Sequence, residues 1–166
     1  MPGHSLVDYR GYASVPREIL FEQVAGLYER RIQVAIHCNG DASIEDGLDA
    51  IEYAMQQHPW PEARLLMIHA QMTREDQIAR MAELGVTPSF FSAHTYYWGD
   101  RHAAIFMGPE RAANLSPARW ALEAGSRLSP LLYTAVTPMF PQQACLRIVE
   151  RQSTGGGVLG AAHSYR

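Results

Sequence analysis

The chain has little cysteine, no run of basic residues and no long hydrophobic stretch. Its two cysteines, Cys38 and Cys145, are too few for a disulfide framework, which favours a reducing, cytoplasmic setting. The net charge is −3 and no Lys/Arg cluster marks a face, so we expect no nucleic-acid partner. We also expect no membrane partner, because no apolar run approaches the roughly 20 residues of a membrane-spanning helix.

The length and composition are those of one ordinary globular domain or of a part of one. The chain has 166 residues, of which 47% are hydrophobic and 19% are charged. That is enough to bury a core, but a closed eight-fold barrel needs about 250 residues. We therefore treat 1–166 as one unit, with a tail at 152–166 that its glycines predict to be flexible.

Segments of helical period alternate with short apolar segments, which indicates an α/β fold built from strand and helix units. The predicted helices lie at 16–30, 42–57, 73–84, 116–124 and 141–151. Thr73 and Asp76 resemble a capping box at the start of the third of these helices. The predicted strands lie at 31–38, 64–70, 86–91 and 127–136. The last strand contains Pro130, which would remove one ladder hydrogen bond from a central strand.

Two histidines end successive predicted strands. His37 closes the strand at 31–38 and His69 closes the strand at 64–70. Each alone is equally well explained as a hydrogen-bonded core or loop histidine, but parallel strands present their carboxyl ends at one face. Neutral imidazole is also the commonest zinc ligand. The pair therefore predicts a metal site, although a catalytic zinc usually needs three protein ligands and a water.

Residues beside the first histidine have competing interpretations. Asn39 and Asp41 could orient a ligand histidine as hydrogen-bonding partners behind it, or could simply form a turn and a helix start. Cys38 could suggest a thiol nucleophile. Because neighbouring strand residues point to opposite faces, a buried structural cysteine is the stronger interpretation.

An aromatic cluster is predicted at the mouth of this site. Tyr96, Tyr97 and Trp98 lie on what the nearby glycine suggests is a loop. Tyr97 and Trp98 could line a substrate pocket, or the cluster could cover the core. We predict pocket lining for these two residues.

Several strings in order resemble family 3 of the amidohydrolase superfamily. They are IHCNGDASIEDGLDAIEYA, IHAQMTREDQIARMAELGVTPSFF, HTYYWGDRH, MGPERAANLSPARWALEAG and VTPMFP. The resemblance covers about residues 10 to 160 and is specific to the family rather than to a substrate. It implies a (β/α)8 TIM barrel beside a small β-sandwich, with this chain corresponding to strands five to eight.

The resemblance also implies roles for individual residues. His37 falls on the metal histidine of the fifth strand, His69 on that of the sixth, and His94 on a histidine near the substrate. The His-x-His pair and the bridging ligand of the family's first half are absent. The eighth-strand aspartate, which binds metal and moves the proton of the attacking water, is replaced by Tyr133 or, with the gap shifted by one, Thr134. A phenol with a pKa of ~10 is a poor base at neutral pH.

The implied activity is metal-dependent hydrolysis of carbon–nitrogen bonds other than peptide bonds. In the complete enzyme a divalent metal, with zinc as the first candidate, would activate water to attack a small amide-like substrate. We expect this chain alone to be inactive. The alternative is a non-catalytic, degenerate half-barrel that self-associates as a homo-oligomer, because four strands would leave one face without an opposing wall.

Overall fold

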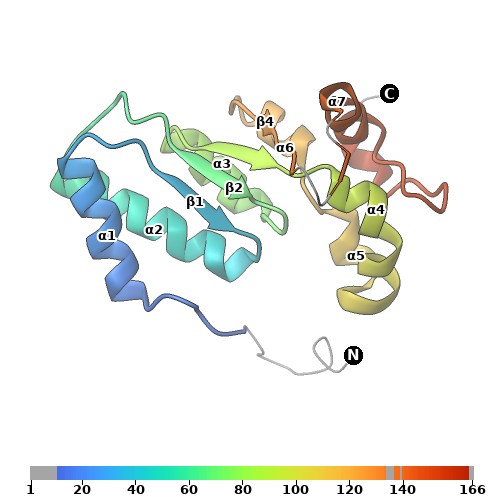
Figure 1. Ribbon diagram of the computed structural model, residues 1–166, viewed down its shortest axis with the longest axis horizontal. Coiled ribbons are helices and arrows are strands. Elements are labelled where there is room, and N and C mark those ends of the chain that lie inside the picture. The colour runs from blue at the N-terminus through green and yellow to red at the C-terminus, as the bar shows by residue number, and fades with distance from the viewer. Residues whose placement is uncertain (1–10, 134–136, 139, 165–166) are drawn as a thin grey trace.

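A computed structural model describes residues 11–133, 137–138 and 140–164, and a parallel sheet lies at its centre (Figure 1). Four strands pair in chain order. They are β1 (Ala35–Cys38), β2 (Leu66–His69), β3 (Thr87–Phe90) and β4 (Ser129–Pro130). Parallel strands joined by helices confirm the predicted α/β class and form part of a barrel wall.

Three helices pack together on one side of the sheet (Figure 1). They are α1 (Arg17–Glu29), α2 (Asp41–Gln57) and α3 (Glu75–Glu83). Apolar residues recur at helical spacing along α2, and Ile44, Leu48 and Ile51 are completely buried. They share one hydrophobic cluster with Cys38 of β1 and Met67 of β2. The core of the domain therefore lies between these helices and the sheet.

The opposite face of the sheet is partly open. Ala35 and His37 are exposed there, and their register partners Leu66 and Ile68 are half-buried. Successive strand residues alternate between the two faces, so these four lie opposite the residues that pack on the helices. In a closed barrel the same face would be covered by the rest of the wall. The described residues thus form one side of a barrel.

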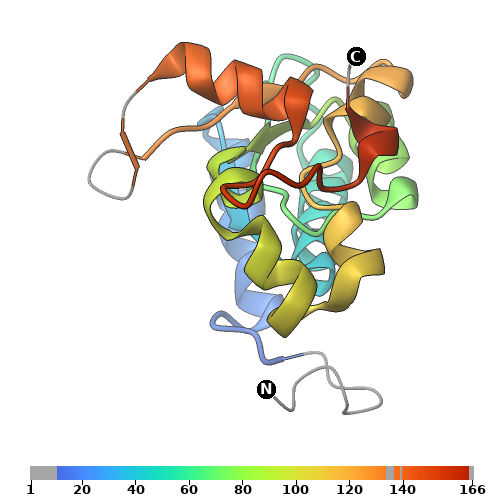
Figure 2. The same ribbon diagram turned by 90° about the vertical axis from the view of Figure 1, so that its right-hand side faces the viewer.

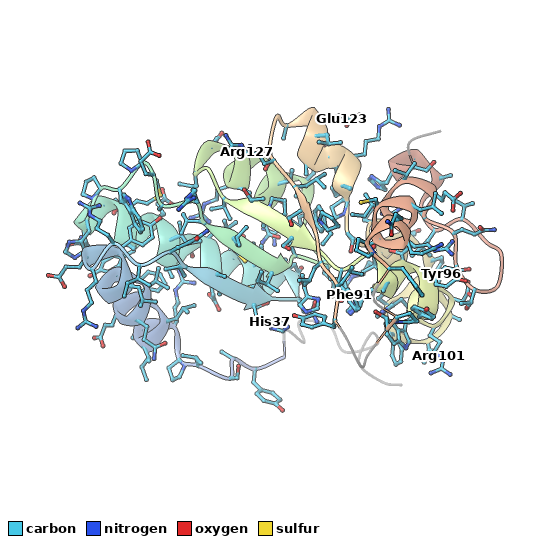
Figure 3. All side chains as sticks on the ribbon, turned by 45° about the horizontal axis from the view of Figure 1, so that its top comes forward. His37, Phe91, Tyr96, Arg101, Glu123 and Arg127 are labelled. Atoms are coloured by element: carbon cyan, nitrogen blue, oxygen red, sulfur yellow. The ribbon has the colours of Figure 1, made fainter. Side chains whose placement is uncertain are left out.

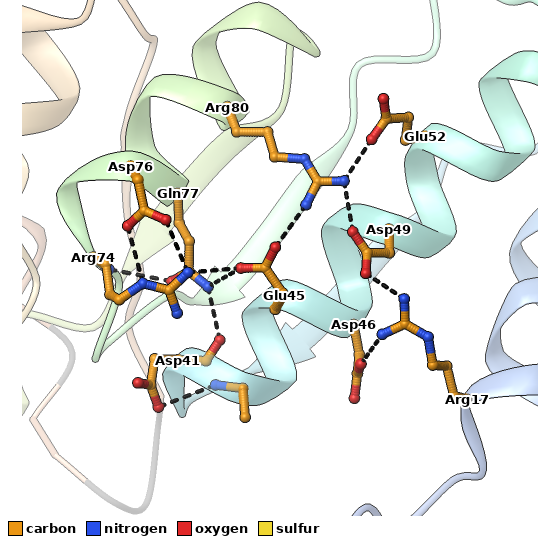
Figure 4. Close-up of polar contacts among 11 residues, drawn as sticks. Arg17, Asp41, Glu45, Asp46, Asp49, Glu52, Arg74, Asp76, Gln77 and Arg80 are labelled. Atoms are coloured by element: carbon orange, nitrogen blue, oxygen red, sulfur yellow. Dashed lines mark hydrogen bonds and ion pairs between the residues drawn. The ribbon is translucent and has the colours of Figure 1, made fainter. Parts of the chain in front are cut away.

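Ion pairs tie α1, α2 and α3 to one another at their surface (Figure 4). Arg80 of α3 reaches Glu45 at 2.9 Å and Asp49 at 2.6 Å, both on α2. Arg17 of α1 binds the carboxylates of Asp46 and Asp49 from the other side. Burial raises the pKa of Asp49, but hydrogen bonds from Arg17 and Arg80 outweigh it and hold the pKa below its usual range. The carboxylates of α2 therefore join the helices.

The rest of the chain is mostly helical and lies beyond the carboxyl ends of the strands (Figures 1 and 2). Its elements are α4 (Ala93–Arg101), the π-helix η2 (His102–Phe106), α5 (Gly108–Ala113), α6 (Ala118–Glu123), α7 (Pro141–Glu150) and the 3-10 helix η3 (Ala161–His163). None of the helices in the described ranges is long and apolar enough to cross a membrane.

A buried arginine connects this helical region to the end of the chain. Arg151 is 1% exposed and follows α7 with a left-handed backbone at φ 55°. Its guanidinium donates to the backbone carbonyls of Leu159, Ser116, Ala113 and Leu115 at 2.6–3.1 Å. Four charge-assisted bonds thus fix the junction of α5 and α6 against the tail.

The tail packs on the same helices. His163 Nε2 lies 2.9 Å from Asn114 Oδ1, and its ring meets Trp120 edge-on with centroids 4.6 Å apart. Ser153 and His163 are buried. The first part of the tail binds α4, where Ser153 and Gly155 donate to the carboxylate of Asp100. Residues 152–164, for which the glycines predict flexibility, are therefore placed against α4 and the junction of α5 and α6.

The element boundaries confirm most of the predictions from the sequence, and three need correction. The fourth strand, expected over 127–136, pairs only at Ser129 and Pro130, and residues 134–136 lie outside the described part. Pro130 has no N–H to donate, and pairing resumes beyond it through Leu131 N, 2.8 Å from Phe90 O. The predicted capping box at Thr73 is wrong by one residue, because Gln77 Oε1 accepts from the backbone N–H of Arg74.

The third correction concerns the aromatic cluster. Tyr96, Tyr97 and Trp98 lie within α4, not on a loop. The glycine that suggested a loop, Gly99, is buried within that helix, and a Cβ there would meet Leu159 Cδ2 at 3.4 Å. That distance is an ordinary van der Waals contact, so this glycine marks neither a turn nor a site that excludes a side chain.

Candidate metal and substrate site

His37 and His69 meet at the carboxyl ends of β1 and β2. Their ring centroids are 4.6 Å apart, and the rings are nearly perpendicular at 82°. His37 is exposed at the tip of β1, as Figure 3 shows, while His69 is 6% exposed. The strand-end argument from the sequence therefore placed these two side chains correctly relative to each other.

Backbone strain helps to aim the second histidine. Alternation along β2 would send His69 to the helix side with Met67, but His69 has φ 69° and Ala70 has φ 45°. Left-handed backbone at a residue other than glycine is uncommon and costs energy, and it concentrates at functional sites. It turns the chain so that the imidazole of His69 reaches His37 on the open face.

Two further histidines continue the array. The ring of His94, near the start of α4, lies 5.4 Å from that of His69, and His102, the first residue of η2, stacks on His94 at 6.1 Å and 21°. Gln71 Nε2 lies 3.3 Å from His102 Nε2. One row of imidazoles therefore runs from the sheet to the π-helix.

Burial disfavours the charged form of His69, His94 and His102. Burial lowers the pKa of His94 to about 4, with further contributions from the charges of His69 and His102. Burial also lowers the pKa of His69, helped by His37, and burial alone lowers that of His102. A neutral imidazole has a free nitrogen lone pair, which is the form that binds metal.

The buried His69 and the half-buried His94 and His102 each have an unpartnered nitrogen among the described atoms. The Nδ1 atoms of His69, His94 and His102 are buried without a hydrogen-bond partner among the protein atoms described. Buried polar atoms are normally paired, with protein, water or a bound species. These three Nδ1 atoms are therefore available for hydrogen bonds or metal coordination that the described residues do not supply.

Tyr133 occupies the place that the resemblance assigns to an aspartate. Its hydroxyl lies 3.2 Å from His69 Nε2, and its ring stacks on that imidazole at 5.4 Å and 20°. The alternative residue for this slot, Thr134, lies outside the described residues. Tyr133 therefore engages one nitrogen of His69 and contributes a neutral phenol where a carboxylate would balance metal charge.

The predicted substrate residues separate onto two faces of α4. Trp98 lies one turn beyond His94, and the two rings are 5.6 Å apart, so both face the histidine row. Tyr97 is 40% exposed and points to another side, where it lines a cavity together with Tyr96. Of the three predicted substrate residues His94, Tyr97 and Trp98, His94 contacts His69 and Trp98 contacts His94, while Tyr97 lies apart from both.

Asn39 and Asp41 show the local contacts of a turn and helix start. Asp41 Oδ1 accepts the N–H of Ala42 at 3.0 Å, and Asn39 O accepts that of Met72 at 3.0 Å. Asn39 Oδ1 is buried and unpartnered among the described atoms. In the described contacts neither side chain reaches His37 or His69, so a role in orienting these histidines stays a prediction.

Cys38 is buried, as the alternation of strand residues predicted. It is 3% exposed, and a Cβ on Gly47 of α2 would meet its sulfur at 3.1 Å. Burial raises the pKa of its thiol to about 12, so the thiol stays protonated. Cys38 is therefore a core residue on the face opposite His37.

The donors present fit a metal ion in kind but not in number. Two imidazoles from adjacent strands are suitable zinc ligands. Across residues 11–133, 137–138 and 140–164, however, no group of three or more His, Cys, Asp or Glu side chains is arranged to hold a metal. The described residues therefore do not form a complete metal centre by themselves.

Sequence reasoning missed His102 and Gln71. The loop interpretation of residues 96–98 hid the relation between His94 and His102, since a helix brings positions i and i+8 within about 80° of each other. The wider turn of η2 then begins at His102. No local signal in the sequence pointed to Gln71.

Comparison with known proteins shows the family and the fold. A model of the amidohydrolase family matches residues 2–131, which ends just before Tyr133. Two crystal structures share the fold, both titled as uncharacterized metal-dependent hydrolases, one from Pyrococcus furiosus and one from Pyrococcus horikoshii OT3. Their TM-scores are 0.70 and 0.71, each at 20% identity.

The chain is much shorter than these structures. The alignments cover 93% and 92% of this chain, but only 30% and 29% of the Pyrococcus chains. The four strands therefore correspond to part of a larger barrel, as the sequence predicted. No curated protein matches the chain by sequence.

Proposed function

The chain belongs to the amidohydrolase family, and we propose that it forms the part of a metal-dependent hydrolase site that carries His37 and His69. The reaction would be hydrolysis of a carbon–nitrogen bond other than a peptide bond. The observation that carries the proposal is the contact of these two imidazoles, 4.6 Å apart, at the carboxyl ends of adjacent parallel strands. Enzymes with this architecture build their sites at that end.

Each side chain has a specific part in this proposal. His37 and His69 would hold a divalent metal, zinc being the first candidate because its usual ligands include neutral imidazole. When bound, the metal would lower the pKa of a water molecule and polarise the substrate carbonyl. His94 would hydrogen-bond the substrate, and Trp98 would pack beside it. The substrate is a small amide-like molecule.

The setting is part of the proposal as well. We propose a cytoplasmic location without a nucleic-acid or membrane partner, supported by two free cysteines and a net charge of −3. The substrate would reach the histidines from the exposed side of His37.

The chain by itself should not catalyse the reaction. Two histidines do not complete a zinc site, and the phenol of Tyr133 cannot serve as a base near neutral pH without a large perturbation. We expect the purified chain, supplied with zinc, to hydrolyse N-acyl and cyclic-amide compounds no faster than buffer. Turnover well above that background would show that the described residues suffice.

Metal binding tests the role of the two histidines directly. The chain is dialysed against micromolar zinc and its metal content measured by mass spectrometry, alongside H37A, H69A and H58A. His58 lies at the other end of α2 and provides the matched control. We expect both site variants to lose the bound zinc and H58A to retain it. Unchanged stoichiometry in H37A or H69A would remove that residue from the site.

A second candidate function is a non-catalytic half-barrel that self-associates. The exposed positions Ala35 and His37 favour it, because an open apolar face and two sheet edges promote pairing with another chain. Light scattering measures the molar mass in solution and so distinguishes a self-associated half-barrel from a monomer. A dimer without zinc or turnover would support this candidate, whereas a monomer that binds zinc would support only the first.

A further inference from the structure

A cavity of about 450 Å³ lies between α4 and α7, away from the histidine row. Its walls include Ala93, Tyr96 and Tyr97 of α4, Phe140 before α7, and Arg147 of α7. This volume is within the range of cavities that bind small molecules, roughly 300 to 1,000 Å³. We propose that this cavity binds a small carboxylic acid with an apolar body and that Arg147 is the partner of the carboxylate.

The walls suit the apolar part of such a ligand. Two tyrosine rings, a phenylalanine ring and the methyl group of Ala93 form most of the surface named above. Tyr96 and Tyr97 meet edge-on, with centroids 4.8 Å apart. Aromatic side chains bury a large area with few rotatable bonds, so they bind apolar groups at small entropic cost.

Arg147 supplies a positive charge to the cavity wall. Its guanidinium lies over the ring of Tyr96, 3.7 Å from the ring centroid, and an arginine stacked in this way can still donate from the edges of its plane. The carboxylate paired with it, Glu150, is 3.6 Å away, longer than a charge-assisted hydrogen bond of about 2.7–2.9 Å. The side chain of Arg147 is only 17% exposed. A bound carboxylate would accept the bonds that Glu150 does not fill.

The cavity is held open by bonds between its walls. Ser92 Oγ donates to Ala144 O at 2.8 Å and so joins the end of β3 to α7. The tail residue Thr154 donates its backbone N–H to Tyr96 O at 2.9 Å. Together with the stacking of Arg147 on Tyr96, these contacts fix the two helices relative to each other, and a preformed site loses less entropy when it binds.

The cavity is separate from the proposed hydrolase site. His94 and Trp98 occupy the face of α4 that meets His69, whereas Ala93, Tyr96 and Tyr97 occupy another. Positions three and four apart share a helix face, which accounts for the division. Binding at the cavity therefore needs neither a metal nor the histidines.

A pair of matched probes tests the proposal. 3-Phenylpropionate carries the carboxylate and the apolar body, and 3-phenylpropan-1-ol carries the same body without charge. Dissociation constants are measured by ligand-detected NMR titration of the whole chain. We expect the acid to bind at least about tenfold more tightly than the alcohol, as one charge-assisted contact allows.

Three variants identify the group responsible. R147Q should lose that preference for the acid, and R147K, which keeps the charge, should retain most of it. R101Q is the control, because this substitution also removes one positive charge, at the end of α4, and Arg101 is not among the residues that line the cavity. Equal affinity for acid and alcohol, no binding of either, or the same loss in R101Q would overturn the proposal. Unchanged preference in R147Q would overturn it too.

Discussion

The two regions of the molecule are held together in different ways. From α1 to β3 the chain repeats a regular unit, with strands of four residues, an apolar core and ion pairs on the outside. From α4 onward the described chain adds only one strand to the sheet, the two-residue β4. There, Ala118, Ala121 and Ile148 join the same apolar core. Buried polar side chains that bind backbone atoms, above all Arg151, fix the remaining segments.

This difference explains how the candidate site is built. The first region delivers His37 and His69 from the ends of adjacent parallel strands, and the left-handed backbone at His69 turns its side chain toward His37. The second region delivers His94 and Tyr133, whose positions depend on how α4 and the segment after β4 are anchored. His37 and His69 therefore depend on the sheet for their positions. His94 and Tyr133 depend on the contacts that anchor the helical region.

Replacing Arg151 by methionine should produce the largest loss of stability. Methionine fills much of the same space but leaves the carbonyls of Ala113, Leu115, Ser116 and Leu159 without their donor. Burial lowers the pKa of Arg151 to about 10, so the native group is still charged at neutral pH. We expect the free energy of unfolding in urea to fall by about 3–5 kcal/mol.

The exposed Arg101 provides the control for this substitution. R101M should change the free energy of unfolding by less than about 0.5 kcal/mol, as most surface substitutions do. If R151M lost no more than R101M, the second region would not depend on its buried guanidinium, and the contrast between the two regions would fail.

A charge on the open face of the first region should weaken self-association. Ala35 is exposed on β1 beside Leu66 of β2, so A35E places a carboxylate on the face proposed to pair. Burying that charge at an interface would cost at least about 1.4 kcal/mol, a tenfold weaker dimer. Analytical ultracentrifugation over a range of concentrations measures this.

Ile19 of α1 gives the matched comparison. It is 44% exposed but lies on a helix rather than on the open face, so I19E should leave association unchanged. Equal weakening by both substitutions would mean that the chains pair through another surface. A monomer at every concentration would contradict self-association itself.

Prediction from sequence succeeded where periodicity and register determine structure. The strand ends at His37 and His69 and the apolar face of α2 follow from alternation and helical spacing, which are local properties of the chain. The same logic placed Cys38 in the core, on the face opposite His37.

Prediction failed where contacts between residues far apart in the sequence determine the local structure or the burial of a side chain. Gly99 indicated a loop, yet it lies inside α4, where Leu159 from far along the chain is its neighbour. The burial of Arg151 depends on carbonyls in the α5–α6 junction, and no sequence pattern marks an arginine as the donor to them. His102 and Gln71 enter the site for similar reasons, through segments whose approach only the folded chain determines.

The ion pairs of the first region should contribute a smaller, pH-dependent stability. R80Q removes the contacts with Glu45, Asp49 and Glu52, and we expect a loss of about 1 kcal/mol in the free energy of unfolding at pH 7. The pKa of Asp49 is lowered in the folded chain. Its contribution is therefore present above its unfolded pKa of ~3.9 and disappears as pH falls through the folded value.

The difference between R80Q and the native chain should accordingly shrink below pH 4. R30Q serves as the control, because Arg30 is exposed at the end of α1 and should show no such dependence. Urea unfolding of both variants and of the native chain, at pH 7 and below pH 4, measures the loss of unfolding free energy at each pH. A difference that persists unchanged in acid would mean that Arg80 stabilises through packing rather than through its carboxylate partners.

The smallest effect should come from two glycines inside the helices of the first region. A Cβ at Gly26 of α1 would meet no atom within 4 Å, whereas one at Gly47 of α2 would lie 3.1 Å from Cys38 Sγ and 3.2 Å from Met67 Cε. Alanine is favoured over glycine in a helix interior by about 0.8–1.0 kcal/mol. We expect G26A to raise the free energy of unfolding by roughly that amount. In G47A the close contacts with the sheet should cancel the gain, because a well-packed core resists added volume. Equal gains in urea unfolding would show that α2 can shift away from β1 and β2, and that the packing of the first region is looser than its regular register suggests.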